Sequence, residues 1–425
     1  MIEKVLTKGN LKQAFHKVRS NNGSAGVDKM TVHELHEHLT ENWHTYLQQI
    51  TNENYQPQPI LGVEIPKSNG KVRMLGIPTV VDRFLQQAVT QILTPLFEVE
   101  FEDFSYGFRP NRNAQQAVLK AQEYINSGYN HIVDIDLKSF FDEVDHCILL
   151  QLLFRKVKCK KLLKLIRKWL RSPMSIKGKL IKRRKGVPQG SPISPLLSNI
   201  MLNELDKVMD KMGLRYVRYA DDFSIYCKSK AEARKIGNKV YLYLKDKLKL
   251  PINREKSGIR KPSQFKILGF GFTSTFTKGD KGKFQLIVLD KSWKSLYEKI
   301  KHVTRKTAPW TLKERIIDLN DIQRGWVQYF KIANISGKLK TMDGWVRNRL
   351  RYCIWKNWKK PERKRKNLIR LGVDPEHAYA YSRTRKGGWA IAQSPILTTT
   401  ITLNRLRAKG YFAMLDYYTK IHSKS

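Results

Sequence analysis

Apolar residues in the first third of the chain recur mainly at helical spacing. Residues 10 to 20 predict a short amphipathic helix. The apolar stripe from Leu85 to Leu96 predicts a long helix that begins at Asp82. A further helix is expected over residues 113–126. Between these helices, one segment has apolar residues at every second position instead.

That segment predicts a β-hairpin. Val63 and Ile65 alternate with polar residues into the turn sequence 66–70, and Val72 and Met74 alternate out of it. The turn ends in Asn69-Gly70, and such a pair readily takes the positive φ angles that tight hairpins require.

The middle of the chain is rich in β-prone residues with helices between them. Further strands are predicted at Ile132–Leu137, Val187, Tyr216–Tyr226, Phe265–Phe272 and Gln285–Leu289. Helices are expected near residues 196–212 and 230–248. Helices packed against a mixed sheet define an α+β protein. From about residue 293 the chain becomes helical, aromatic and basic, and its Trp and Tyr stripe is expected in the core, with Arg347, Arg349, Arg351 and Lys356 as RNA contacts.

Composition and charge identify the class of partner. The 425 residues are 41% hydrophobic, enough for globular domains with cores. Lys and Arg number 80 against 37 Asp and Glu, which gives a formal charge of +43. So large an excess repels itself unless a polyanion neutralises it, and this favours a nucleic acid. A membrane surface is the weaker alternative, because the basic residues are spread along the chain rather than placed beside an apolar helix.

The N-terminus and the cysteines predict a cytoplasmic location. The first residues carry no apolar signal segment, and no apolar run approaches the length of a membrane span. Cys147, Cys159, Cys227 and Cys353 are scattered and form no C-x-x-C pair. This spacing argues against a zinc site and a disulfide framework, and it suits a reducing compartment.

Two short segments place carboxylates inside apolar, β-prone stretches. Asp136 is the next-to-last residue of the stretch 132–137, and Asp221-Asp222 sit where the stretch 216–226 should turn. An isolated Asp-Asp pair is most often an ordinary turn. Here the flanking strands would hold the turn rigidly, so Asp136 could converge on it. Asp134 shares a strand face with Asp136 and is a competing carboxylate.

Three converging carboxylates require cations. Two Mg²⁺ ions, with Mn²⁺ as an alternative, would relieve their repulsion. One ion would activate a primer 3′-hydroxyl, and the other would hold the triphosphate of a dNTP and stabilise the departing pyrophosphate. The pattern therefore predicts nucleotidyl transfer by in-line displacement.

At these residues the chain resembles a known family. Tyr219-Ala220-Asp221-Asp222 is similar to the palm motif of reverse transcriptases, and the surrounding blocks resemble those of bacterial group II intron reverse transcriptases in order and spacing. The similar blocks are Gly23–Asp28, Ile65–Arg73, Tyr106–Pro110, Gly186–Pro195, Asn253–Lys256, Leu268–Phe270 and Arg324–Phe330. No H-N-H endonuclease block with cysteine pairs is present, so the chain resembles the endonuclease-lacking, group IIC-like subgroup.

The resemblance implies roles for single residues. Asp136, Asp221 and Asp222 would be catalytic and would bind the metal, together with Leu137. The nucleotide-contacting residues implied are Lys67, Arg73, Leu137, Phe141, Gln189 and Lys256. A cationic hairpin suits triphosphate binding, although Lys67 and Arg73 could equally be two solvated charges. Phe141 would exclude ribonucleotides by a clash at the sugar 2′-position; its alternative is simple core packing, as expected for Phe140.

The resemblance also implies the architecture and the partners. The expected fold is a right-hand polymerase whose fingers and palm carry an antiparallel sheet, followed by a helical thumb or maturase domain and a small nucleic-acid-binding module. The expected boundaries are 1–30 for an N-terminal extension, 31–290 for fingers and palm, 291–360 for the thumb and 361–425 for the last module. Partners would be group II intron RNA, an RNA template with a DNA or RNA primer, and target DNA, with a monomer or a dimer both open.

Three functional hypotheses remain distinct. The first is an intron-encoded reverse transcriptase that also acts as a maturase, binding intron RNA to assist splicing and mobility. The second is a splicing-only RNA-binding maturase, against which the intact Asp136, Asp221 and Asp222 argue. The third is a reverse transcriptase of a retron, a CRISPR system or phage defence, and the thumb signature at Arg324–Phe330 disfavours it.

Overall fold

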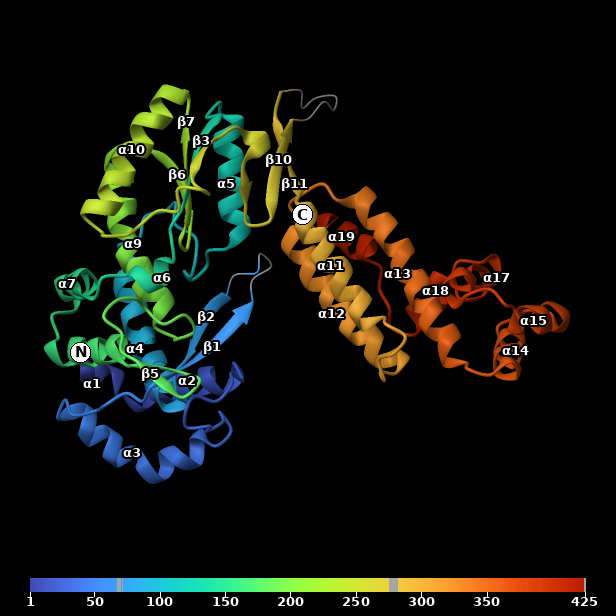
Figure 1. The fold of residues 1–425 in the computed structure, drawn as a ribbon, viewed down its shortest axis with the longest axis horizontal. Coiled ribbons are helices and arrows are strands. Elements are labelled where there is room, and N and C mark those ends of the chain that lie inside the picture. The colour runs from blue at the N-terminus through green and yellow to red at the C-terminus, as the bar shows by residue number, and fades with distance from the viewer. Residues whose placement is uncertain (67–69, 71, 275–281, 424–425) are drawn as a thin grey trace. The chain divides into compact units, whose positions relative to one another are not determined.

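The structure is a computed structural model that describes residues 1–66, 70, 72–274 and 282–423. The chain divides into two compact units, Met1–Pro262 and Ser263–Ser425 (Figure 1). Both units combine helices with sheets. The predicted mixture of helices and sheets is therefore confirmed.

The first unit holds two four-stranded sheets and helices α1 to α10. Its elements are α1 (Ile2–Val5), α2 (Lys8–Ser20), α3 (Leu35–Thr51), β1 (Ile60–Pro66), β2 (Val72–Ile77), α4 (Val80–Glu98), α5 (Ala114–Asn126), β3 (His131–Asp136), α6 (Phe140–Glu143), α7 (His146–Val157), α8 (Lys160–Arg171), β4 (Met174–Ile176), β5 (Lys179–Ile181), α9 (Ser194–Lys211), β6 (Arg215–Tyr219), β7 (Asp222–Cys227), α10 (Lys230–Asp246) and β8 (Gly258–Arg260).

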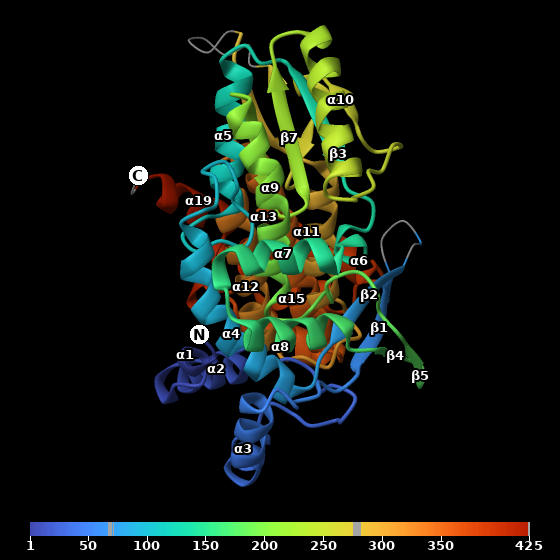
Figure 2. The ribbon, with the colours of Figure 1, turned by 90° about the vertical axis from the view of Figure 1, so that its left-hand side faces the viewer.

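The palm sheet, as we call the sheet with strand order β6-β7-β3-β8, is antiparallel throughout. Val133 and Ile135 of β3 and Phe223 and Ile225 of β7 are buried in the main apolar core. Because side chains alternate along a strand, the acidic residues of β3 and β7 are left on the opposite face. Helix α9 runs from this sheet towards α4 and α7 in both views (Figures 1 and 2).

The fingers sheet, as we call the sheet with strand order β2-β1-β4-β5, is not purely antiparallel. Strands β1 and β2 form the predicted hairpin, in which Ile65 faces Arg73 and Pro66 faces Val72. Strand β4, however, pairs with β1 in parallel. The expectation of an antiparallel sheet thus holds for the palm sheet and fails for one strand pair of the fingers, because β1 and β4 are joined through β2, β3 and helices α4 to α8 and not by a tight turn.

Two local expectations need correction. The helix predicted to begin at Asp82 begins at Val80, because the hydroxyl of Thr79 accepts a hydrogen bond from the Asp82 N–H and caps it. Val187 lies in a loop and not in a strand. Its N–H donates to the carbonyl of Phe141 at 2.6 Å, a single bond that extends into no ladder.

The second unit is a small sheet followed by helices. After a 3₁₀ turn at Pro262–Gln264, its elements are β9 (Lys266–Ile267), β10 (Phe270–Ser274), β11 (Phe284–Val288), α11 (Asp290–Val303), α12 (Leu312–Phe330), α13 (Ser336–Asn357), α14 (Pro361–Arg370), α15 (Pro375–Ser382), α16 (Gly388–Ala392), α17 (Pro395–Thr400), α18 (Leu403–Ala408) and α19 (Met414–His422). The sheet packs on α12 through Phe270 and Phe330, whose ring centroids are 5.0 Å apart.

Buried arginines hold these helices together. Arg315 is 2% exposed and donates to four backbone carbonyls between Val303 and Trp310. Arg351, named above as an RNA contact, is also buried and donates to the carbonyl of Ile401 at 3.0 Å. Its guanidinium therefore stabilises the fold of this unit, and the RNA-contact expectation for Arg351 is wrong.

The first unit ends before the boundary expected at residue 290. Strands β9, β10 and β11 belong to the second unit by their contacts. The four-part division of the chain stays a prediction. No helix among residues 1–66, 70, 72–274 and 282–423 is long and apolar enough to cross a membrane.

Candidate functional site

Three aspartates from two strands and one turn meet at the end of the palm sheet. In the antiparallel register of β3 and β7, Asp136 lies directly opposite Asp222. Directly paired residues have Cα atoms roughly 4.5–5.5 Å apart. Tyr219 pairs with Asp222, so Ala220 and Asp221 form the two-residue turn of the β6–β7 hairpin. Asp221 therefore stands beside the facing pair.

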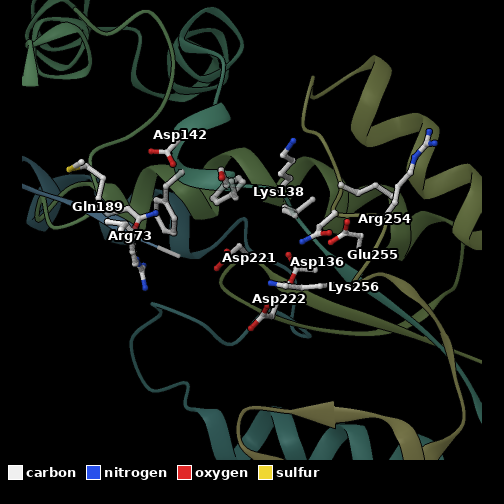
Figure 3. Close-up of a pocket in the computed structure, with 18 residues that line it drawn as sticks. Arg73, Asp136, Lys138, Asp142, Gln189, Asp221, Asp222, Arg254, Glu255 and Lys256 are labelled. Carbon is white, nitrogen blue, oxygen red and sulfur yellow. Dashed lines mark hydrogen bonds and ion pairs between the residues drawn. The ribbon is translucent and has the colours of Figure 1, made fainter. Parts of the chain in front are cut away.

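These residues line a cavity of about 890 Å³. Figure 3 shows Asp136, Asp221 and Asp222 gathered near its centre, with Lys256 beside them and with Arg73 and Gln189 further along the wall. The cavity is lined by Val72, Arg73, Met74, Asp136, Leu137, Lys138, Ser139, Phe140, Phe141, Asp142, Gln189, Asp221, Asp222, Ile252, Asn253, Arg254, Glu255 and Lys256. Except for Lys67, every site residue expected from the sequence lies on it.

Asp221 of the turn and Asp222 of β7 both have raised pKa values. Burial, followed by the charges of Asp221 and Asp136, raises the pKa of Asp222 to about 6. Burial likewise raises the pKa of Asp221, and the charge of Asp136 adds to the effect. Three neighbouring carboxylates cannot all carry a negative charge without a large free-energy cost unless a cation is present. The cluster is therefore suited to a bound cation.

The donor set fits magnesium in chemistry but does not form a closed protein cage. Carboxylate oxygens are the ligands that this hard ion prefers. Among the described residues, no three or more Asp, Glu, His or Cys side chains are placed so that together they could hold a metal ion. Magnesium in nucleotide sites is usually held by one or two carboxylates together with phosphate oxygens and water. An incomplete protein cage therefore agrees with a site completed by the substrate.

The loop that precedes β8 holds Asp136. The Asp136 carbonyl accepts from the Asn253 N–H at 2.8 Å, and its N–H donates to the hydroxyl of Ser257 at 3.0 Å. Lys256 of the same loop pairs its ammonium with the Asp136 carboxylate at 3.0 Å. This lysine supplies positive charge where the carboxylates repel one another.

Asp134, the competing carboxylate, is engaged elsewhere. Its side chain pairs with Arg260 Nε at 2.8 Å and does not line the cavity. Strand β8, which carries Arg260, pairs with β3 on the side away from β7. Asp134 is therefore engaged by Arg260 at the outer side of β3, although it shares a face with Asp136 and its charge contributes to the raised pKa of Asp222.

Arg73 and Gln189 come together on the fingers side of the cavity. The Nε of Arg73 on β2 donates to the side-chain oxygen of Gln189. The loop carrying Gln189 docks on β2, where its carbonyl accepts from the Gly76 N–H at 2.7 Å. Gly190 has a φ of +117°, and a Cβ there would lie 2.5 Å from the Gly76 carbonyl, so a side chain at 190 would push the loop away.

Leu137 directly follows Asp136, Phe141 lies five residues after it, and both line the cavity. Ser139 takes a φ of +48°, which turns the chain after β3 and begins the short helix α6. Phe141 is 8% exposed and Phe140 2% exposed, with ring centroids 5.2 Å apart. Leu137 is buried and pairs by a bridge with Ile252. Lys67 lies outside the described residues.

Sequence reasoning missed the supporting groups of this site. Ser257 was not identified, although it directly follows the block that ends at Lys256. Lys138 and Arg254 also line the cavity, and Arg254 points away from the acids (Figure 3). The sequence offered one signal for these residues: each carries a hydroxyl or a positive charge within or beside a recognised motif. What such a residue contacts could not be known without the register of β3 and its neighbours.

Comparison with protein families gives two adjacent matches. Residues 65–272 match the model of the reverse transcriptase (RNA-dependent DNA polymerase) family. Residues 293–372 match the maturase-specific domain of group II introns. The first match contains all three aspartates, and the second covers much of α11 to α14.

Several individual proteins are similar to this chain. The chain is 32% identical to protein YkfC of Escherichia coli over 272 residues, which span 55% of this chain and 71% of YkfC. It is 29% identical to the group II intron-encoded protein LtrA of Lactococcus lactis over 383 residues, which span 69% of this chain and 64% of LtrA. A chain of a Cas6-RT-Cas1–Cas2 complex covers 57% of this chain at 25% identity, with a TM-score of 0.36 and 42% of that chain covered.

Proposed function

This chain belongs to the group II intron reverse transcriptases, and from that membership we propose that it copies RNA into DNA at the cavity containing Asp136, Asp221 and Asp222. The single observation that carries this proposal is the register of the palm sheet. It sets Asp136 opposite Asp222 and leaves Asp221 in the adjoining turn. Residues more than 80 positions apart thereby share one cavity.

The carboxylates would hold two magnesium ions. When bound, such ions lower the pKa of a primer 3′-hydroxyl and stabilise the charge of the departing pyrophosphate. Bound cations would lower the raised pKa values of Asp221 and Asp222 and so favour their ionised forms. Lys256, now paired with Asp136, would then face the phosphates. The chain's own part is to fix these oxygens in place.

The other side of the cavity would orient the nucleotide. Arg73 provides a guanidinium fork that suits phosphate oxygens. Gln189, held by Arg73 and by the docked loop, offers an amide to the base or template. The Phe141 ring at the cavity wall would exclude a 2′-hydroxyl by steric clash. Together these groups select a deoxynucleotide and align its α-phosphorus.

The second unit would carry the maturase activity. Its match to the maturase-specific domain and the resemblance of LtrA, an intron-encoded protein by name, support binding of intron RNA. The whole chain has 80 Lys and Arg against 37 Asp and Glu, and this positive charge favours contacts with RNA phosphates. We propose group II intron RNA, an RNA template with its primer, and target DNA as the partners.

Primer extension on an RNA template tests the polymerase proposal. With dNTPs and Mg²⁺, the purified protein should extend a DNA primer to the template end, and EDTA should stop extension. The Asp136→Ala variant is the matched control, since it removes one carboxylate and the partner of Lys256. If wild-type protein binds RNA but makes no cDNA with either Mg²⁺ or Mn²⁺, the splicing-only maturase becomes the better description.

A further inference from the structure

The turn that carries Asp221 is held from below by a buried polar network. Arg218 on β6 and Asp206 on α9 are both fully buried and form an ion pair at 2.6 Å. Arg218 Nε also donates to both Asp206 oxygens at 2.9 Å. Neither residue lines the cavity. Their position nevertheless connects them directly to it.

The remaining arm of the guanidinium reaches the turn. Arg218 Nη1 donates to the carbonyl of Ala220 at 3.0 Å and to the side-chain oxygen of Asn199 at 2.9 Å. Ala220 is the residue before Asp221, and its φ is +57°. A left-handed backbone is strained for alanine and persists only where its surroundings determine it. The guanidinium contact is one such determinant.

A second contact supports the turn from its other side. Asn199 Nδ2 donates to the carbonyl of Gly107 at 2.9 Å. A Cβ at Gly107 would lie 2.2 Å from the Ala220 nitrogen, so the backbone of 107 touches the backbone of the turn. Two backbone hydrogen bonds hold the segment 104–107 beside β6. The Arg218 N–H donates to the Phe104 carbonyl, and the Tyr106 N–H donates to the Arg218 carbonyl. Arg218, Asn199 and Gly107 thus enclose Ala220.

An ion pair placed only to join β6 to α9 would not need this geometry. Its Asp206 contacts alone would satisfy that purpose, and a buried ion pair is often no more stabilising than apolar residues of similar size. The Nη1 contacts instead connect the pair to the turn. Lysine could keep the charge opposite Asp206, but a single ammonium cannot reproduce the planar fork that serves three partners.

We propose that Arg218 is a positioning residue for nucleotidyl transfer: with Asp206 and Asn199 it fixes the Ala220 carbonyl, and so sets Asp221 beside Asp136 and Asp222. The inference rests on the proposed polymerase activity. It goes beyond that activity in assigning a catalytic effect to residues that touch no substrate and no metal.

Arg218→Lys is the first test. Outer residues that orient ligands typically change metal affinity or activity by about 10- to 100-fold. We expect kcat for primer extension to fall by about that factor, the KM for dTTP to change by less than about threefold, and Mn²⁺ affinity, measured by paramagnetic resonance of free Mn²⁺, to weaken. Amide exchange should rise in the peptide 216–226.

A double variant separates positioning from stability. Arg218→Met with Asp206→Leu replaces the ion pair by apolar side chains and should recover much of the unfolding midpoint. The proposal requires kcat and Mn²⁺ affinity to stay low in this variant. Recovery of both together with stability would overturn it, because the pair would then act only as a core contact.

Tyr55→Phe is the matched control. It removes one buried hydrogen bond, 2.9 Å from the Tyr55 hydroxyl to Asp82, in a part of the same unit that does not line the cavity. It should lower the unfolding midpoint without changing Mn²⁺ affinity or exchange in 216–226. If wild-type protein makes no cDNA at all, the polymerase proposal fails, while the Mn²⁺ and exchange measurements still decide whether Arg218 positions the turn.

Discussion

Asp82 in the core and Asp222 in the cavity show two ways of accommodating a carboxylate. Asp82 is 1% exposed and accepts four hydrogen bonds, from Tyr55, Thr79, Trp169 and the Gln58 N–H. Within the described residues, no other side chain donates a hydrogen bond to Asp221 or Asp222. The protein satisfies the first acid by itself and leaves the others to an external ligand.

This difference explains why one acid is structural and the others are candidates for catalysis. A buried carboxylate without donors raises the free energy of the folded state, and four donors offset much of this cost at Asp82, although burial still raises its pKa. Of the three acids at the cavity, Asp136 alone forms an ion pair with a described residue, Lys256. Unsatisfied acids that face open space are suited to bind cations. The comparison therefore predicts opposite responses to mutation in the two places.

The largest effect is expected from Asp221→Ala. Loss of a metal-binding carboxylate should reduce cDNA synthesis by at least about 10³-fold, because charge stabilisation in the transition state depends on it. RNA affinity should stay within about twofold, since this acid contributes no positive charge. Gel-based primer extension and an RNA-binding titration measure the two. Retained synthesis would show that the catalytic acids lie elsewhere.

Asp82→Ala should act on stability instead. The change strands the buried donors of Tyr55 and Trp169, so the free energy of unfolding should fall by about 3 kcal/mol. Denaturant titration measures this loss. Extension per folded molecule should be preserved. A variant as stable as the wild type would contradict the structural role assigned to Asp82.

The two phenylalanines after Asp136 extend the comparison to apolar residues. Phe141→Ala should raise incorporation of ribonucleotides relative to deoxynucleotides by about tenfold or more, because the ring would no longer clash with a 2′-hydroxyl. Phe140→Leu is the control: it should lower stability by about 1 kcal/mol and leave sugar selection unchanged. Competition between rNTPs and dNTPs in primer extension measures both. Equal selectivity in the two variants would remove Phe141 from this role.

The smallest effect is a pH dependence in metal-free protein. The pKa of Asp222 is about 6 in the folded state against an ordinary value of 3.8. Because the folded pKa is raised, its contribution to stability is fully present below about pH 4 and is lost as the pH rises through about 6. Asp222→Asn cannot ionise and should not show this loss.

The difference between wild type and Asp222→Asn should therefore develop between about pH 4 and pH 6. It should amount to a few degrees in the unfolding midpoint at most, because the Asp222 side chain, although partly desolvated by its neighbours, keeps contact with solvent that screens its charge. Thermal unfolding in EDTA measures it. Added Mg²⁺ should reverse the sign by stabilising only the wild type. If the unfolding midpoints of wild type and Asp222→Asn differed by the same amount at every pH, the folded protein would not raise the pKa of Asp222.

The sequence by itself determined the local elements and the candidate chemistry. The β1–β2 hairpin and helices α2 and α5 follow from alternation, helical periodicity and capping, which depend on near neighbours. The nucleic-acid partner follows from net charge. The acids stood out because Asp136, Asp221 and Asp222 interrupt apolar β-prone stretches, an arrangement that local propensity disfavours.

Only the tertiary structure decided how these residues act together. The register of β3 against β7 places Asp136 opposite Asp222, and the pairing of β8 assigns Asp134 to Arg260. The same holds for the buried Arg351 and for Arg218 beneath the turn. An arginine in the sequence carries a charge, but whether that charge faces solvent, a phosphate or a backbone carbonyl depends on contacts between segments far apart in the chain.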